Sequence, residues 1–235
     1  MFDISEPINI QDVHKAPDKP GLYVWYARLS MGKADWHVDY SGGENNAKAS
    51  FLRVLQDHSM KFCQQEISVT AFANFSTEWK GLLEEKNSSR WRKGLEVETS
   101  CGEPSALSCV ASQNHTREAL IELINSSFPI FHSPLYLGRA VDQTLKERLK
   151  QHKNAFLDLW ERYLRDRETI SRINKPNDFA GRAIKLGFRR EDLFCYTLTL
   201  NKSHANKLTT EELNAVITFS EWILNRWTTP ILGRQ

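Results

Sequence analysis

Three stretches of the chain have the hydrophobic pattern of β-strands. Residues 21–26 are apolar or aromatic on both alternating sets, which predicts a strand covered on both faces and therefore central in a sheet. Residues 134–138 predict a second strand, with a proline at its start and a glycine at its end. In 193–200, large apolar residues occupy every second position, which predicts a third strand. These strands are widely separated along the chain.

Helical periodicity follows the second strand and returns near the end of the chain. Asp142 or Thr144 can cap a helix that continues to Ile173, with leucines and a phenylalanine along one side. The last helix begins at Thr209 or Thr210 and runs to the proline near the end of the sequence. Both helices are amphipathic, so each is expected to cover part of the sheet.

The remaining segments flank or separate the predicted strands. The first residues are polar and rich in proline, which predicts a capping arm. The stretch from Leu29 to Ser133 is too long to be a structureless loop in a compact domain. Within it the pattern predicts helices at 47–58, 79–85 and 116–124, a strand at 67–75, and a serine-rich connector at 100–112.

Composition and charge narrow the class of protein. With 235 residues and 40% hydrophobic residues, the chain can fold either as one elaborated domain or as a core with an inserted lobe. The formal charge of +2 says little about partners, but residues 139–190 hold 14 Lys and Arg against 7 Asp and Glu, a local balance of +7. This stretch is either a basic face for an anionic partner or a solvated helical surface.

The cysteines and the apolar segments point to a cytoplasmic location. Cys63, Cys101, Cys109 and Cys195 form neither a zinc-ribbon spacing nor a disulfide framework, so we expect reduced thiols. Cys101, Cys109 and His115 match no common zinc pattern. No basic segment leads into an apolar run at the start, and no apolar stretch approaches the length that spans a bilayer.

Two tripeptides and a helical pair carry the candidate chemistry. Gly21-Leu22-Tyr23 lies in the first predicted strand and Tyr136-Leu137-Gly138 in the second. Arg148 and His152 follow at a spacing of four, which places both on one helix face, where they could converge on one phosphate. This arrangement resembles the GIY-YIG nucleases.

The end of the chain extends the resemblance and also departs from it. Glu221 is followed nine positions later by Pro230, as in the closing motif of the family. Gly233 stands where the family commonly has Asn, and the tyrosines of the two tripeptides are 136 − 23 = 113 positions apart, about ten times the usual spacing. A folded insertion between the two strands reconciles this spacing with the family pattern.

The resemblance implies an α+β fold with a small three-stranded antiparallel sheet flanked by helices. The nuclease-like core would comprise 1–28 and 134–235, and the inserted lobe 29–133. Substrate or partner recognition would belong to the lobe, which also offers a surface for a protein partner or for a second copy of the chain.

The implied reaction is metal-dependent hydrolysis of phosphodiester bonds. Glu221 would bind one Mg²⁺ or Mn²⁺ ion, because a single carboxylate suits cations that keep several waters. Arg148 would grip the phosphate, and Tyr23 would act as general base or position the attacking water. His152 competes for the base role because its ordinary pKa of about 6.5 suits it better. The candidate catalytic residues are Tyr23, Tyr136, Arg148, His152 and Glu221.

The expected partner is nucleic acid, in particular DNA, in a restriction or phage-defence setting. A sequence-independent grip on backbone phosphates is predicted for Arg139, Lys146, Lys150, Lys153, Arg162 and Arg165. Two alternatives stay open. One is a catalytically inactive module that binds nucleic acid or a protein, which Gly233 favours. The other is a structural interaction protein that uses aromatics of the lobe such as Trp79 and Trp91.

Overall fold

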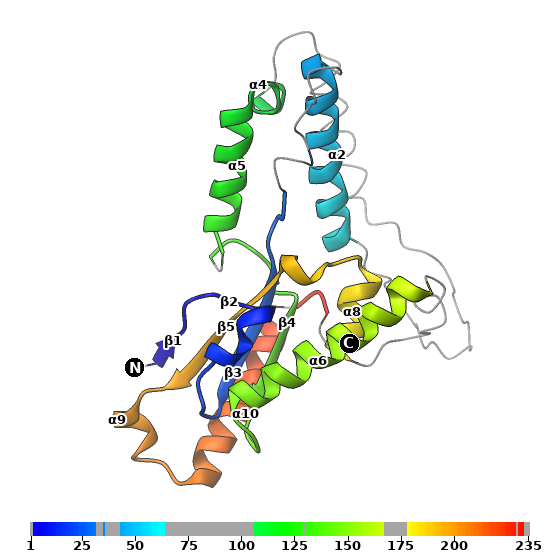
Figure 1. The fold of residues 1–235 in the computed structure, drawn as a ribbon. Helices are drawn as coiled ribbons and strands as arrows, with labels where there is room; N and C mark the ends of the chain where they lie inside the picture. Colours follow the sequence, from blue (N-terminus) through cyan, green and yellow to red (C-terminus); the bar gives the residue numbers. More distant parts are fainter. Residues whose placement is uncertain are drawn as a thin grey trace, which may run out of the picture. The chain divides into compact units, whose positions relative to one another are not determined.

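The computed structural model describes residues 2–31, 35, 43–63, 106–128, 130–166, 178–228 and 230–232. The chain divides into two compact units, one formed by Met1–Ser30 with Ser127–Gln235 and the other by Met31–Ser126 (Figure 1). The sequence prediction places the corresponding boundaries at 28/29 and 133/134. Several predicted features lie outside the described residues: the strand at 67–75, the helix at 79–85, the helical extension to Ile173, Trp91, Cys101 and Gly233.

The first unit is built on a five-stranded antiparallel sheet. Its strands are β1 (Phe2–Ile4), β2 (Ile8–Asn9), β3 (Gly21–Ala27), β4 (Tyr136–Ala140) and β5 (Leu193–Leu200). They are ordered β1-β5-β3-β4, and β2 also pairs with β5. The register sets Tyr23 opposite Gly138 and Trp25 opposite both Tyr136 and Cys195, so the three predicted strands are neighbours.

The α+β class is confirmed, but the expected number of strands is wrong. The N-terminal arm supplies β1 and β2, which pair with the edge of β5 that faces away from β3. These strands have only three and two residues, too few for an alternating pattern to reveal. A 3-10 helix, η1 (Ile10–Lys15), then leads to β3. The arm therefore extends the sheet.

Helices lie on both faces of this sheet. α6 (Leu145–Arg165) and α8 (Phe179–Lys185) pack on the face that carries Tyr23 and Trp25, as the ring contacts of these two side chains show. α10 (Thr210–Thr228) contacts β4 and β3, and Arg139 reaches it from the opposite face of β4. In Figure 1, α6 lies in front of the sheet and α10 behind it.

The two long helices begin where the sequence predicts. Thr144 caps α6: its side chain accepts from the Glu147 backbone N–H, and the Glu147 carboxylate accepts from the Thr144 N–H. Thr209 and Glu212 make the same reciprocal pair before α10. α8 and the short α9 (Lys202–Ala205) are additional helices that the sequence pattern does not predict. Capping explains why both long helices start at a threonine.

The second unit contains three described helices, α2 (Gly43–Cys63), α4 (Ala106–Ser112) and α5 (Asn114–Ser126). The predictions at 47–58 and 116–124 are confirmed, whereas residues 106–112 form a helix instead of a connector. Phe51 and Ala111 are fully buried and pack with neighbouring aliphatic side chains. Arg117 is buried as well, and it donates through Nε to the Ala111 carbonyl at 2.7 Å.

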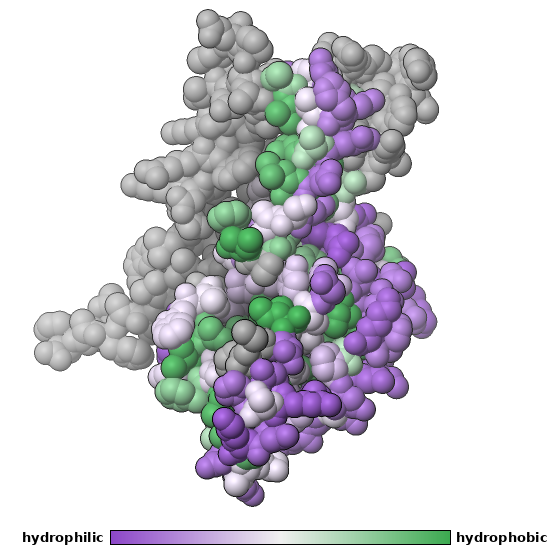
Figure 2. Space-filling view, turned by 90° about the vertical axis from the view of Figure 1, so that its left-hand side faces the viewer, coloured by the Kyte–Doolittle hydropathy of each residue, from purple (hydrophilic) through white to green (hydrophobic). Residues whose placement is uncertain are grey.

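The described surface carries both apolar and hydrophilic side chains, and two of the cysteines are free thiols. Figure 2 shows one side of the molecule, on which apolar patches lie between hydrophilic residues. Cys109 is exposed, Cys195 is buried, and both are free thiols; burial raises the pKa of Cys195. Throughout the described ranges, no helix combines the length and apolar character needed to cross a bilayer.

Candidate active site

A cavity of about 510 Å³ lies in the first unit, beside the outer strand β4. Its lining comes from β3, from β4 and the loop that follows, from the first turn of α6, and from one side of α10. The lining residues are Tyr23, Tyr136, Leu137, Arg139, Ala140, Val141, Asp142, Gln143, Arg148, Thr218, Glu221, Trp222, Asn225 and Arg226. This volume is within the range of pockets that bind small molecules. It could also hold one or two nucleotides of a longer nucleic acid.

Tyr23 and His152 form a buried hydrogen-bonded pair at one wall of the cavity. Tyr23 Oη lies 2.6 Å from His152 Nε2. Tyr23 is 1% exposed but lines the cavity, whereas His152 is 9% exposed and does not line it. The imidazole therefore reaches the cavity only through the phenol.

Burial fixes the protonation of this pair. Burial, reinforced by Tyr136, raises the pKa of Tyr23 despite the opposing effect of Arg148. Burial together with the Arg148 charge lowers the pKa of His152 to about 3. At neutral pH both groups are uncharged, and in the tautomer with its proton on Nδ1, His152 accepts a hydrogen bond from the Tyr23 hydroxyl at Nε2.

Gly138 leaves the space that the two tyrosines occupy. A Cβ at this position would lie 2.6 Å from Tyr23 Cζ and 2.9 Å from Tyr136 Cε1, closer than atoms can approach without a shift. The ring centroids of Tyr23 and Tyr136 are 6.2 Å apart. The glycine of the second tripeptide is thus required by the tyrosine of the first.

An aromatic layer supports the buried pair from behind. Phe179, at the start of α8, stacks on Trp25 with ring centroids 5.1 Å apart, and its ring meets that of His152 edge to face at 5.5 Å. Arg182, one turn later, places Cζ 5.5 Å from the centroid of the Tyr136 ring. Because α8 is short, its position depends on this packing and on the Asp178 cap, which accepts from the Gly181 N–H at 2.7 Å.

A chain of side-chain hydrogen bonds orients Arg148. Its Nη1 donates to Gln151 Oε1 at 3.0 Å, and Gln151 Nε2 donates to Gln143 Oε1 at 2.6 Å. Arg148 remains partly exposed and lines the cavity close to Tyr23. Its planar guanidinium is suited to bind two oxygens of one phosphate.

Glu221 projects from α10 toward the same cavity and forms an ion pair with Arg139. Arg139 Nη1 donates to Glu221 Oε2, and the carboxylate side chain is 20% exposed. Asn225, one turn later, donates through Nδ2 to the Glu221 carbonyl at 3.0 Å. The pair joins β4 to α10 and holds the carboxylate at the rim of the cavity.

The charge of the lining favours an anion. Arg139, Arg148 and Arg226 contribute three positive charges, and Asp142 and Glu221 contribute two negative ones, which leaves +1. No three His, Cys, Asp or Glu side chains gather as a ready-made metal site in the part of the chain that the structure describes. The carboxylates that the lining offers to a cation are those of Asp142 and Glu221, and water would complete the coordination.

The structure brings most of the predicted catalytic residues together. Tyr23, Tyr136, Arg148 and Glu221 line the cavity, and His152 contacts it through Tyr23. Of the predicted phosphate contacts, Arg139 lines the cavity and pairs with Glu221. Those that do not line it are Lys146, Lys150, Lys153, Arg162 and Arg165. Lys153 donates to the Gln11 carbonyl at 2.9 Å, and Arg165 pairs with Glu161 at 3.5 Å.

Some residues of the site escape sequence reasoning. Phe179 and Arg182 belong to α8, whose seven residues are too few for a helical pattern. Trp222, Asn225 and Arg226 line the cavity beside Glu221. Only Asn225, four positions after Glu221, shares its helix face and so gives a signal in the sequence. Trp222 and Arg226 lie one and five positions after Glu221, on the adjoining side of the helix.

Comparison of the chain with protein-family models, with curated proteins and with solved structures finds no match to any of them.

Proposed function

We propose that this chain is a metal-dependent endonuclease that hydrolyses phosphodiester bonds in DNA. The observation that carries the proposal is the convergence of Tyr23, Tyr136, Arg148 and Glu221, which come from four separate elements, in one cavity. The surplus of positive charge in the lining supports an anionic substrate. The resemblance of the two tripeptides and the Arg–His helix to GIY-YIG nucleases rests on these same residues.

Arg148 binds the non-bridging oxygens of the scissile phosphate. Its guanidinium supplies two parallel donors, and it neutralises charge that grows in the transition state. Gln151 holds the guanidinium from the helix side, so the donors facing the cavity remain oriented. Substrate binding and turnover both depend on this residue.

Tyr23 positions the attacking water through its hydroxyl oxygen, while Nε2 of His152 accepts a hydrogen bond from the same hydroxyl and fixes its orientation. His152 cannot act directly, since Tyr23 occupies Nε2 and the imidazole does not line the cavity. Because burial raises the pKa of Tyr23, the phenol is protonated at neutral pH and would act as a base only if positive charge at the site favoured the phenolate. Arg148 supplies part of that charge.

Glu221 is the residue that would hold a Mg²⁺ or Mn²⁺ ion. It lines the cavity and is partly exposed, and the open volume beside it leaves room for the waters that these cations retain. Such an ion supplies Lewis-acid stabilisation of phosphate charge and lowers the pKa of bound water. Arg139 shares the carboxylate through Oε2, so binding of the ion weakens or replaces that ion pair.

One observation favours a second candidate, a catalytically inactive module that binds nucleic acid. The Arg139–Glu221 ion pair neutralises the carboxylate that the metal would need. In this alternative the basic lining binds phosphate without hydrolysis, and Lys146, Lys150 and Arg162 extend the contact along the exposed side of α6. A cleavage assay separates the two candidates.

The test is incubation of the purified protein with single- and double-stranded DNA and RNA in Mg²⁺, Mn²⁺ or EDTA. We expect cleavage of DNA with either metal and none with EDTA. Glu221→Gln keeps the shape of the side chain and should lower the cleavage rate by about 100-fold or more. Glu211→Gln, an exposed carboxylate two turns or more away on α10, is the matched control and should cleave normally.

Normal cleavage by folded Glu221→Gln would remove Glu221 from the metal site. DNA binding without cleavage in any metal would instead support the inactive module.

A further inference from the structure

α10 presents large aromatic side chains to solvent. Phe219 is 60% exposed and Trp222 50% exposed, although both are large apolar residues on a helix that otherwise packs on the sheet. Their rings are stacked, with centroids 5.6 Å apart and planes inclined by 13°. Stacked rings that remain this exposed leave aromatic surface available to a partner.

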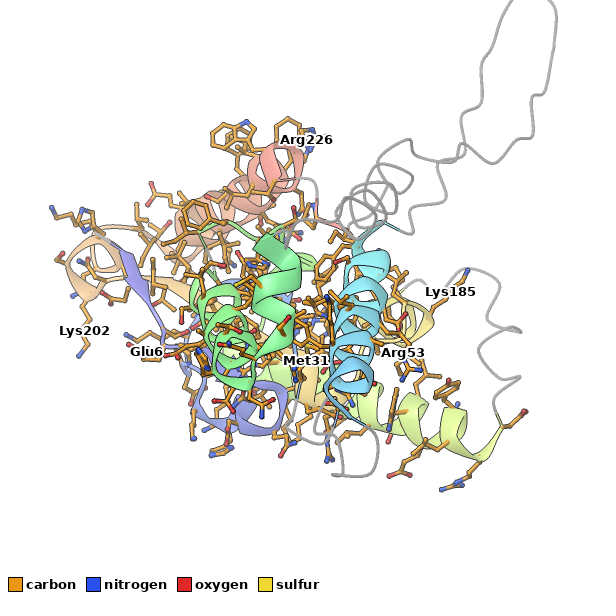
Figure 3. All side chains as sticks on the ribbon, turned by 90° about the horizontal axis from the view of Figure 1, so that it is seen from above. Glu6, Met31, Arg53, Lys185, Lys202 and Arg226 are labelled. Carbon is orange, nitrogen blue, oxygen red and sulfur yellow. The ribbon has the colours of Figure 1, made fainter. Side chains whose placement is uncertain are left out.

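Arg226 completes this surface. Its Cζ lies 3.6 Å from the centroid of the Trp222 ring, and its Nη1 donates to the Trp222 carbonyl at 3.1 Å. Phe219, Trp222 and Arg226 follow one another at positions i, i+3 and i+7, so they form one stripe along the helix. Figure 3 shows Arg226 on the outer side of α10, with aromatic side chains projecting from the same helix near it.

The stripe is continuous with the candidate active site. Trp222 and Arg226 both line the cavity that also contains Arg148 and Glu221, and Phe219 lies beyond Trp222 on the exposed side. A nucleic acid strand with one phosphate bound at Arg148 can therefore place its neighbouring nucleotides along α10. The surplus of positive charge in the cavity selects a partner that is anionic as well as aromatic.

We propose that Phe219, Trp222 and Arg226 form a stacking platform for unpaired bases, which makes single-stranded nucleic acid the ligand of this surface. The inference rests on the proposed function of the cavity, because the cavity is taken to hold the phosphate. Aromatic rings and guanidinium planes stack on any base, so the platform is indifferent to sequence. Paired bases inside a duplex are already stacked on each other and cannot use it.

The experiment measures binding of 5′-fluorescent oligothymidylate of about 12 nucleotides by anisotropy, in EDTA so that nothing is cleaved. A duplex and an abasic strand of equal length are the comparison ligands. Trp222→Ala should bind oligothymidylate about tenfold more weakly and the abasic strand as the unchanged protein does. Trp222→Phe should restore most of the affinity.

Trp227→Ala is the matched control. Trp227 is a tryptophan of the same helix and is 76% exposed, but it does not line the cavity. This variant should bind all three ligands normally. If Trp222→Ala cannot be purified in folded form, the binding of the unchanged protein still tests the platform. Its affinity for oligothymidylate should be about tenfold higher than its affinity for the abasic strand.

Three results would overturn the platform. Equal affinity of the unchanged protein for the abasic and the base-bearing strands removes stacking while leaving the proposed nuclease intact. Loss of self-association in Trp222→Ala, with no change in oligonucleotide binding, makes this face an interface between copies of the chain. Absence of binding to any nucleic acid removes both the platform and the proposed function.

Discussion

The two tripeptide glycines are required by close approaches that involve different parts of the fold. A Cβ on Gly138 would collide with the rings of Tyr23 and Tyr136, whereas one on Gly21 would collide with the Leu198 carbonyl of the neighbouring strand. Gly138 therefore preserves the candidate site, and Gly21 preserves the sheet. The sequence pairs each glycine with a tyrosine, but only the packing separates their roles.

Gly138→Ala is expected to disturb the site more than the sheet. The new methyl group displaces the Tyr23 ring, and Tyr23 cannot move without losing its hydrogen bond to His152. Overpacking of this kind costs about 1–3 kcal/mol. Urea unfolding should show that loss of stability, and the cleavage assay should show a larger relative loss of activity. A variant with unchanged stability and cleavage would contradict the close packing of the two tyrosines.

His152 makes stability depend on pH in a specific window. Its pKa is about 3 in the folded protein and about 6.5 in the unfolded chain, so between these values the unfolded chain binds one more proton. The free energy of unfolding therefore falls as pH is lowered through this window, by at most about 1.4 kcal/mol per pH unit from this group. From about one pH unit above 6.5 the contribution is constant.

His152→Gln should remove this dependence, because an amide can still hydrogen-bond Tyr23 but does not titrate. Urea unfolding of both proteins at pH 8.0, 6.5, 5.5 and 5.0 measures the two slopes, and the pH 8.0 values provide the internal reference. Equal slopes below pH 6.5 would show that His152 binds a proton in the folded state, which the buried contact with Tyr23 excludes.

At the level of elements, local chemistry explains which helices the sequence predicts. α6 and α10 begin at Thr144 and Thr209, each followed three residues later by a glutamate that completes the cap. α8 has no comparable length, and β1 and β2 depend on pairing with a strand about 190 residues away. Short elements that exist only through distant partners carry no periodic pattern of their own.

Thr144→Ala should test how far the α6 cap supports the site. Removal of the side-chain acceptor costs about 1 kcal/mol, and the first turn of α6 carries Arg148 into the cavity. We expect that loss in urea unfolding together with a reduced cleavage rate. Thr209→Ala is the matched control, since it removes the same bond from α10 three turns before Glu221.

A similar stability loss in both variants, with a larger activity loss in Thr144→Ala, would support a role of the cap in placing Arg148. Equal activity losses would attribute the effect to general destabilisation.

At the scale of the whole molecule, the sequence predicts the central strands better than the surfaces around them. The 21–26 pattern predicts a central strand, and β3 does pair on both sides. The same kind of reasoning predicts an amphipathic last helix but does not reveal that Phe219 and Trp222 remain exposed. A hydrophobic residue shows its preference for burial, whereas the element that would cover it is decided by the rest of the chain.

Because residues 31–126 form a compact unit of their own, we expect that they can be removed without unfolding the first unit. β3 and β4 are antiparallel neighbours, and the Leu135 N–H donates to the Trp25 carbonyl at 2.8 Å. The end of β3 and the start of β4, which the intervening stretch connects, are therefore already side by side. Phe128 must stay, because it packs with Tyr26 and Phe194 in the first unit. Replacing residues 31–126 by a short Gly/Ser linker keeps this cluster and costs little loop entropy.

We expect the shortened chain to unfold cooperatively in urea and to keep metal-dependent cleavage, because every residue assigned to the site lies in the first unit. Its preference among DNA substrates should weaken, because long surface insertions usually determine which substrate binds and not which reaction takes place. Cleavage of a panel of single- and double-stranded substrates, compared with the full chain, measures that change. A folded, shortened protein with unchanged preference would exclude the second unit as the specificity element. A folded one without metal-dependent cleavage would place essential chemistry in residues 31–126.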